Sequence, residues 1–99
     1  MNIAETIRDQ IKALDFWALG AWGAKDFIKT RSADATTEGL RFKTSGMVKW
    51  KGYVSIELNG QDLYDVKFQR IRKLKVVTDK ELHNIFADQL VEIINAQVG

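Results

Sequence analysis

The chain of 99 residues contains no cysteine and no proline, and it has a single histidine. Without cysteine it cannot form a disulfide framework, a cysteine-type zinc site or a thiol nucleophile. No apolar run approaches the length of a membrane span, and the first ten residues lack the basic start and unbroken apolar stretch of a signal peptide. We therefore expect a cytoplasmic protein with no membrane partner, no cofactor and no bound metal ion.

The charges of the chain are unevenly distributed. Its length, with 45% hydrophobic and 28% charged residues, favours one compact domain over residues 1–99. The formal net charge is only +2, yet residues 41–75 carry nine basic against three acidic side chains, and the remainder carries six against ten. The basic middle is the part of the chain that would meet a polyanionic partner.

Apolar residues recur at helical spacing in the first part of the chain, at Ile3, Ile7, Ile11, Leu14, Ala18 and Ala21. This spacing predicts an amphipathic helix over residues 2–22. Phe16 and Leu19 would project from its polar face. Either the helix breaks at Asp15, which can cap a new helix, or it exposes an apolar patch.

Trp17 and Trp22 flank a stretch of small residues in this segment. Tryptophan in such a place usually packs in the core or covers it. If the segment is exposed, it forms an apolar surface suited to self-association into a homo-oligomer or to binding another protein. That surface would consist of Phe16, Trp17, Leu19 and Trp22.

Three segments alternate between apolar and polar residues and predict an antiparallel sheet, namely residues 39–44, 47–58 and 61–71. Phe27 and Ile28 could start a short fourth strand at the edge. Residues 30–38 have no large apolar residue and no period, which is typical of a loop.

The loops between these strands follow from which residues must share a face. Apolar even-numbered residues face one another if three-residue loops join the strands at 44–46 and 58–60, with Gly46 in the left-handed conformation. This register places Trp50 beside Phe68, and Val66 opposite Gly52.

Thr78 and Glu81 have the spacing of a capping box and precede an apolar run. They predict a second helix over residues 79–96. The expected fold is therefore α+β with two layers, in the order helix, antiparallel meander of three to four strands, helix, and with both helices on one face of the sheet.

The other face of this predicted sheet is basic and contains an aromatic ring. It carries Arg41, Lys43, Lys49, Lys51, Tyr53 and Lys67, with Arg70 and Arg72 near its edge. Cations neutralise a phosphate backbone and a ring stacks on a base, so this pattern predicts a binding surface for DNA or RNA. The alternative is a solvated face, because lysine also protects sheets against aggregation.

Two further patterns in the chain bear on its function. The order helix, three strands, helix resembles double-stranded-RNA-binding domains in topology, but the lysine-rich start of their second helix is missing here.

Asp65 and Lys67, with Glu57 or Asp62, resemble half of a restriction-type nuclease site, where acids hold Mg²⁺ and lysine supports the attacking water. We favour charge balancing for Asp65 and Lys67, and a position at the edge of the core for His83.

The segments LDFWALGAWGAKDF, KWKGYV and LNGQDLYDV give the chain a family resemblance. Across most of its length it resembles small accessory proteins of tailed phages of gut bacteria. No established activity comes with this family. The resemblance implies an accessory protein in the cytoplasm of the host cell that acts on nucleic acid or on a host protein. From the residues themselves, we favour a non-enzymatic binding protein that uses the basic face of the sheet.

Overall fold

The computed structural model describes residues 3–31, 37–45 and 48–99. The helices are α1 (Ile3–Leu14), α2 (Ala18–Ala21) and α3 (Leu90–Val98), with a 3₁₀ turn, η1 (Ala87–Gln89), before α3. The strands are β1 (Lys25–Arg31), β2 (Glu38–Lys43), β3 (Tyr53–Leu58), β4 (Tyr64–Arg72) and β5 (Lys75–Ile85). They form one antiparallel sheet in sequential order, so the predicted α+β class is confirmed and the predicted count of three to four strands is wrong.

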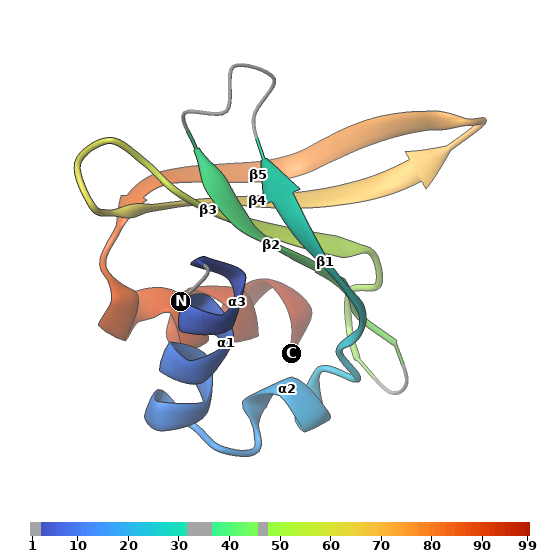
Figure 1. The fold of residues 1–99 in the computed structure, drawn as a ribbon. Coiled ribbons are helices and arrows are strands. Elements are labelled where there is room, and N and C mark those ends of the chain that lie inside the picture. The colour runs from blue at the N-terminus through green and yellow to red at the C-terminus, as the bar shows by residue number, and fades with distance from the viewer. Residues whose placement is uncertain (1–2, 32–36, 46–47) are drawn as a thin grey trace.

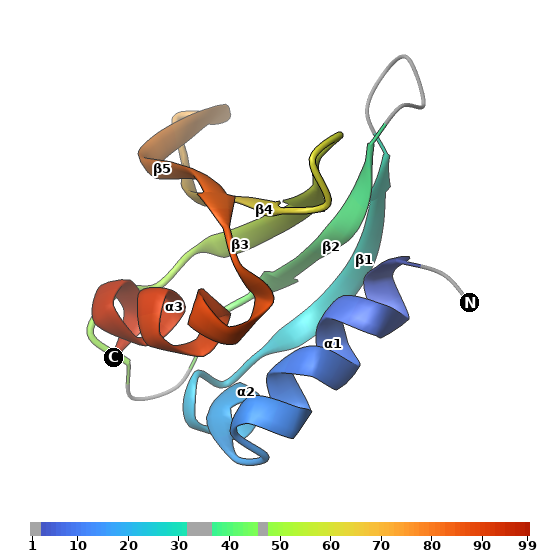
Figure 2. The same cartoon turned by 90° about the vertical axis from the view of Figure 1, so that its left-hand side faces the viewer.

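The helices lie together on one side of the sheet (Figure 1). Figure 2 shows α1 beneath the β1 and β2 end, with α3 beside it. The core fills the space between these layers. It consists of Ala4, Ile7, Ile11, Ala18, Trp22, Leu40, Phe42, Val54, Ile56, Tyr64, Val66, Phe68, Leu90, Ile94 and Val98.

The first helix ends earlier than predicted. Helix α1 stops at Leu14, and the Asp15 carboxylate then accepts a hydrogen bond from the Trp17 backbone N–H at 3.0 Å. This local bond redirects the chain into the short helix α2, because a capping side chain satisfies a donor that a continuing helix would bond internally. The expected break at Asp15 is confirmed, and a continuous helix over 2–22 is wrong.

The four residues of the predicted apolar surface differ in their exposure to solvent. Trp22 is buried, with 1% of its surface exposed; its ring stacks on Phe42 at 6.1 Å, and its indole N–H donates to the Asn95 side chain at 3.2 Å. Leu19 is half-buried and packs against the core. Phe16 and Trp17 are exposed. The predicted apolar surface is therefore reduced to two aromatic rings, because the turn after α1 points Trp22 inward.

Residues 75–85 form strand β5, where a helix over 79–96 was predicted. The strand pairs with β4 from Arg72 opposite Lys75 to Tyr64 opposite Ile85, and α3 begins only at Leu90. Lys73 and Leu74 join the two strands with φ angles of +48° and +66°. Two consecutive positive φ angles are typical of a tight hairpin turn whose twist matches that of the strands. Thr78 and Glu81 therefore lie within a strand that pairs with β4, and not at the start of a helix as the predicted capping box required.

The connection between β2 and β3 is longer than predicted. Phe42 pairs with Val54 and Lys43 with Tyr53, so β3 starts at Tyr53 and residues 44–52 connect the strands. Even residues still face even residues, but the predicted loop at 44–46 is wrong. Met47, Gly46 with its predicted left-handed conformation, and residues 32–36 of the predicted loop at 30–38 lie outside the described residues.

The connection between β3 and β4 also differs. Leu58 pairs with Tyr64, so the loop has five residues, 59–63, and Val66 pairs with Ile56 and not with Gly52. The Asn59 side-chain oxygen accepts from the backbone N–H groups of Gln61 (2.8 Å) and Leu63 (3.2 Å). This Asx-type turn explains why the Asn-Gly pair does not make a two-residue turn.

Candidate nucleic-acid interface

A basic hollow lies at the end of the sheet where β2 ends and β3 begins, beside the part of β4 that continues beyond them. Its volume is about 400 Å³, and its lining consists of Lys43, Lys51, Gly52, Tyr53, Arg70, Ile71 and Arg72. The register accounts for this gathering, since Lys43 pairs with Tyr53, and Tyr53 pairs with Gln69, the residue before Arg70. We name this site the basic hollow.

Thr44 holds Gly52, one of the residues that line the hollow. Thr44 is buried, and its hydroxyl accepts from the Gly52 N–H at 3.0 Å while lying 3.2 Å from the Gly52 carbonyl oxygen. Its backbone N–H donates to the same carbonyl at 2.8 Å. A buried threonine thus holds the irregular segment that presents Lys51.

Gly52 is needed for close packing at this point. A Cβ atom added there would lie 2.5 Å from the Gln69 carbonyl oxygen and 2.6 Å from the Trp50 ring. Trp50 in turn packs edge-on against Phe68, with ring centroids 5.6 Å apart. The predicted contact between Trp50 and Phe68 therefore exists, but it joins a loop to a strand and is not a cross-strand pair.

Two further contacts position the segment from the side of α3. The backbone N–H groups of Lys49 and Trp50 donate to the Val98 carbonyl oxygen at 2.9 and 3.2 Å. Since Val98 is the last residue of α3, the helix end and the connection hold each other in place. The Lys49 side chain is exposed and does not line the hollow.

Tyr53 is held by Arg41, whose guanidinium lies 5.1 Å from the centroid of the tyrosine ring. This is the distance range of a cation–π contact, which adds electrostatic attraction to the packing of the two groups. The contact orients the ring at the edge of the hollow. It also places the charge of Arg41 next to the hollow, although Arg41 does not line it.

Asp79 on β5 pairs with Arg70 and also accepts the indole N–H of Trp50 at 3.0 Å. The hydrogen bond from Arg70 and then that from Trp50 lower the pKa of the Asp79 carboxyl below its usual value. A second Arg70 bond, Nη2 to Asp79 Oδ1, measures 3.1 Å. The carboxylate therefore neutralises one cation of the hollow and fixes its guanidinium.

The remaining cations of the hollow form no ion pair among the described residues, although the charge of Arg72 also stabilises the Asp79 carboxylate. Within 3–31, 37–45 and 48–99, Lys43, Lys51 and Arg72 make no ion pair. Three unpaired cations beside a tyrosine, a glycine and Ile71 combine positive charge with an apolar surface. Such a site can accept phosphate groups and a flat ring together.

Five of the eight predicted nucleic-acid residues line the hollow, namely Lys43, Lys51, Tyr53, Arg70 and Arg72. Arg41 contacts Tyr53, whereas Lys67 lies in the middle of the sheet and pairs with Glu81 at 3.8 Å. Sequence reasoning missed Thr44 and Asp79. Thr44 acts on Gly52 within a connection whose length the sequence pattern does not determine, and Asp79 lies in a segment that was predicted to be a helix.

The sheet face opposite the helices is not uniformly basic. Glu57 pairs across the sheet with Asp65, and His83 lies 3.4 Å from Asp65 and 3.3 Å from Glu81. His83 is exposed and is not at the edge of the core, because β5 and not a helix carries it. The predicted basic residues that come together therefore do so at one end of the sheet, at the basic hollow.

The Asp65 carboxylate, considered for the nuclease pattern, is engaged by protein donors. Its Oδ1 accepts from the Asn59 amide at 3.1 Å and from the Asn84 backbone N–H at 3.2 Å. Burial raises the pKa of Asp65, but these bonds and His83 outweigh burial and hold the pKa below its usual value. In the described part of the chain, no three His, Asp or Glu side chains are placed to hold a metal ion.

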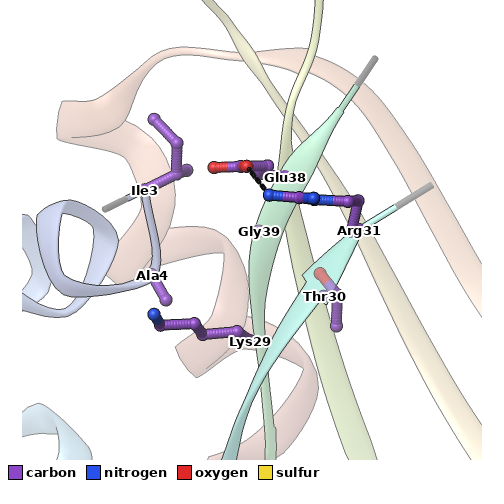
Figure 3. A pocket seen from close by; sticks show the side chains of 7 residues that line it. All are labelled: Ile3, Ala4, Lys29, Thr30, Arg31, Glu38 and Gly39. Atoms are coloured by element: carbon purple, nitrogen blue, oxygen red, sulfur yellow. Dashed lines mark hydrogen bonds and ion pairs between the residues drawn. The ribbon is translucent and has the colours of Figure 1, made fainter. Parts of the chain in front are cut away.

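A second hollow, of about 260 Å³, lies between the first turn of α1 and the strands β1 and β2. Figure 3 shows its rim, where Arg31 donates to Glu38 at 2.7 Å, and Lys29 extends toward the start of α1. The Arg31–Glu38 ion pair neutralises both charges, and no aromatic ring lines this hollow. The basic hollow is therefore the better candidate for a polyanion.

No protein-family model, curated protein or solved structure matches the chain. The resemblance to phage accessory proteins therefore stays a prediction. Over the ranges that the structure describes, no helix has the length and apolar character needed to cross a lipid bilayer.

Proposed function

We propose that the protein is a binding module that holds nucleic acid at the basic hollow. The observation that carries this proposal is the gathering of Lys43, Lys51 and Arg72, all without an ion pair among the described residues, around Tyr53. Separate phosphates would bind these cations, and a base would stack against the tyrosine. The binding surface in this proposal is smaller than the whole sheet face that the sequence predicts, because it covers only one end of the sheet.

The anchoring of the hollow supports a binding role. Thr44 and the Val98 carbonyl fix the loop that carries Lys51, and Arg41 fixes Tyr53. Groups held in place before binding lose less conformational freedom when a ligand arrives, which favours affinity. A solvated lysine face has no need of such anchoring.

The test is a fluorescence-anisotropy titration of labelled single-stranded and duplex DNA and RNA at several salt concentrations. The variant Lys43→Gln/Lys51→Gln/Arg72→Gln removes three charges from the hollow. The control Lys12→Gln/Lys29→Gln/Arg31→Gln removes the same charge from α1 and β1. We expect salt-sensitive binding that the first variant loses and the control retains.

Two outcomes would contradict the proposal. One is the absence of binding at low salt by the wild-type protein. The other is an equal loss in both triple variants, because it would mean that net charge and not the hollow attracts the polyanion.

A second candidate function is protein interaction through Phe16 and Trp17. These rings are 68% and 76% exposed, and they contact each other edge to face at 5.1 Å. Large exposed aromatic residues are enriched in protein interfaces, so the pair could mediate self-association or the capture of a host protein.

Sedimentation at increasing protein concentration tests self-association through these two rings. A wild-type mass that rises, with a Phe16→Ser/Trp17→Ser variant that stays monomeric, would support it, whereas equal masses would refute self-association.

A further inference from the structure

The end of the β4–β5 hairpin stands free of the rest of the sheet. Strand β3 pairs with β4 only as far as Gln69, so residues 70–77 have no strand neighbour other than each other. Figure 1 shows this hairpin extending beyond the other strands. We name residues 70–77 the arm.

The arm has an unusual composition for an exposed ribbon. Its sequence, RIRKLKVV, alternates four cations with apolar residues over most of its length and contains no acid. Ile71 pairs with Val76, and Arg72 pairs with Lys75. Since paired residues share a face and successive residues alternate, one face of the ribbon carries Ile71 and Val76, and the other carries three cations, Arg70, Arg72 and Lys75, with Val77.

The residue at the tip of the arm, Leu74, has an exposed apolar side chain and an unfavourable backbone conformation. Leu74 is 99% exposed and has a φ angle of +66°, in the left-handed region that a branched apolar residue rarely adopts. Asparagine or glycine would suit this turn position better. An apolar side chain kept in a strained, fully exposed position points to a function for that side chain.

We infer that the arm enters a groove of a nucleic-acid duplex and inserts Leu74 between base pairs. This inference rests on the proposed function, because Arg70, Ile71 and Arg72 belong to both the arm and the basic hollow. A two-stranded ribbon fits a DNA groove, and its cations would contact the phosphates on either side. Apolar wedges that unstack one base step are a recurring device of proteins that kink the duplex.

Continuity with the hollow favours a duplex over an anionic membrane. Tyr53, Lys43 and Lys51 lie at the base of the arm, where they would hold the phosphates beyond the inserted step. A membrane would need a broader apolar surface than one tip residue with Ile71 and Val76 behind it.

The test uses the whole protein and a duplex that contains 2-aminopurine, whose fluorescence rises when its base unstacks. The variant Leu74→Asn removes the wedge, and asparagine suits the left-handed turn, so the hairpin should remain folded. Leu14→Asn is the matched control at the end of α1. Thermal unfolding followed by circular dichroism establishes that both variants fold.

We expect the wild-type protein and Leu14→Asn to raise the 2-aminopurine fluorescence. We expect Leu74→Asn to abolish the rise and to weaken duplex binding about tenfold, the effect of losing one buried leucine side chain from an interface. Binding to single strands should change little, because there is no base pair to wedge.

Three results would overturn the inference. If Leu74→Asn equals wild type while the hollow variant loses binding, the arm does not act as a wedge, although the proposed function stands. If the wild-type protein binds no nucleic acid, both fail. Binding to phosphatidylserine vesicles that depends on Leu74, with no fluorescence change on duplex, would assign the arm to a membrane surface.

Discussion

The substitution Asp79→Asn should strengthen nucleic-acid binding, although residue 79 need not touch the ligand. Asp79 neutralises Arg70, which lines the basic hollow. Asparagine removes the charge but keeps an oxygen that can accept the Trp50 indole N–H. The substitution therefore frees one cation without removing a group from the packed core.

The magnitude follows from the number of unpaired cations. The hollow and the arm together carry five cations that form no ion pair with a described residue, namely Lys43, Lys51, Arg72, Lys73 and Lys75. Each duplex phosphate contact contributes about 0.9 to the slope of log affinity against log salt, so wild type should show a slope of about −4.5. Freeing Arg70 should steepen the slope to about −5.4 and raise affinity about five- to tenfold near 0.1 M salt.

The assay is the anisotropy titration on a duplex at four or more salt concentrations. Asp9→Asn changes the net charge equally on α1, away from the hollow, and serves as the control. If Asp79→Asn and Asp9→Asn give the same slope and affinity, the phosphates do not reach Arg70, and the placement of the ligand is wrong.

Three further predictions concern the parts that hold the hollow and the sheet. Thr44→Val should destabilise the protein by about 1 kcal/mol because it leaves the half-buried Gly52 N–H without its acceptor, whereas Thr44→Ser should unfold near wild type in urea. Gly52→Ala should weaken duplex binding and lower the melting temperature, since its Cβ would press on the Gln69 carbonyl; unchanged values for both would refute the close approach. The Asp65 carboxyl should titrate below its unfolded pKa of about 3.9, as followed by NMR. The ionised Asp65 carboxylate should therefore contribute fully to stability at pH values above its unfolded pKa. This contribution should be lost as the pH falls through the lower pKa of the folded state. Asn59→Ala should raise the pKa of Asp65, and an unchanged titration would contradict the assigned hydrogen bond.

Alternation along the strands was enough to predict which residues face the core. Leu40, Phe42, Val54, Val66 and Phe68 are all buried, as their even positions indicated. The register was wrong because parity limits a loop to an odd number of residues but does not choose among odd lengths. The observed connections have nine and five residues, and side-chain bonds from Thr44 and Asn59 select them.

The fifth strand was missed for a different reason. Thr78 and Glu81 match a capping box, and Leu82, Phe86 and Leu90 match a helical period. Pairing with β4 overrides both patterns. The hairpin turn at Lys73 and Leu74 contains neither glycine nor asparagine, so nothing local indicated it. The same unusual turn is what makes the arm a candidate for function.

The candidate site was found in outline because its residues share a simple property. Lysine, arginine and tyrosine concentrate between residues 41 and 75, and five of them line the basic hollow at one end of the sheet. The neutralising partners could not be found in this way, since Asp79 and Glu81 come from a strand assigned to a helix. Charge pattern located the surface, and only the fold showed which charges remain unpaired.

The most direct test of the central claim is a titration of ¹⁵N-labelled protein with a short DNA duplex, followed by backbone amide NMR shifts. The account predicts that the largest shifts occur at Lys43, at residues 51–53 and at residues 70–75. The α1 and β1 amides should stay near their free positions. Shifts confined to α1, α2 or β1, or no shifts at a concentration where anisotropy reports saturation, would contradict a nucleic-acid site at the basic hollow.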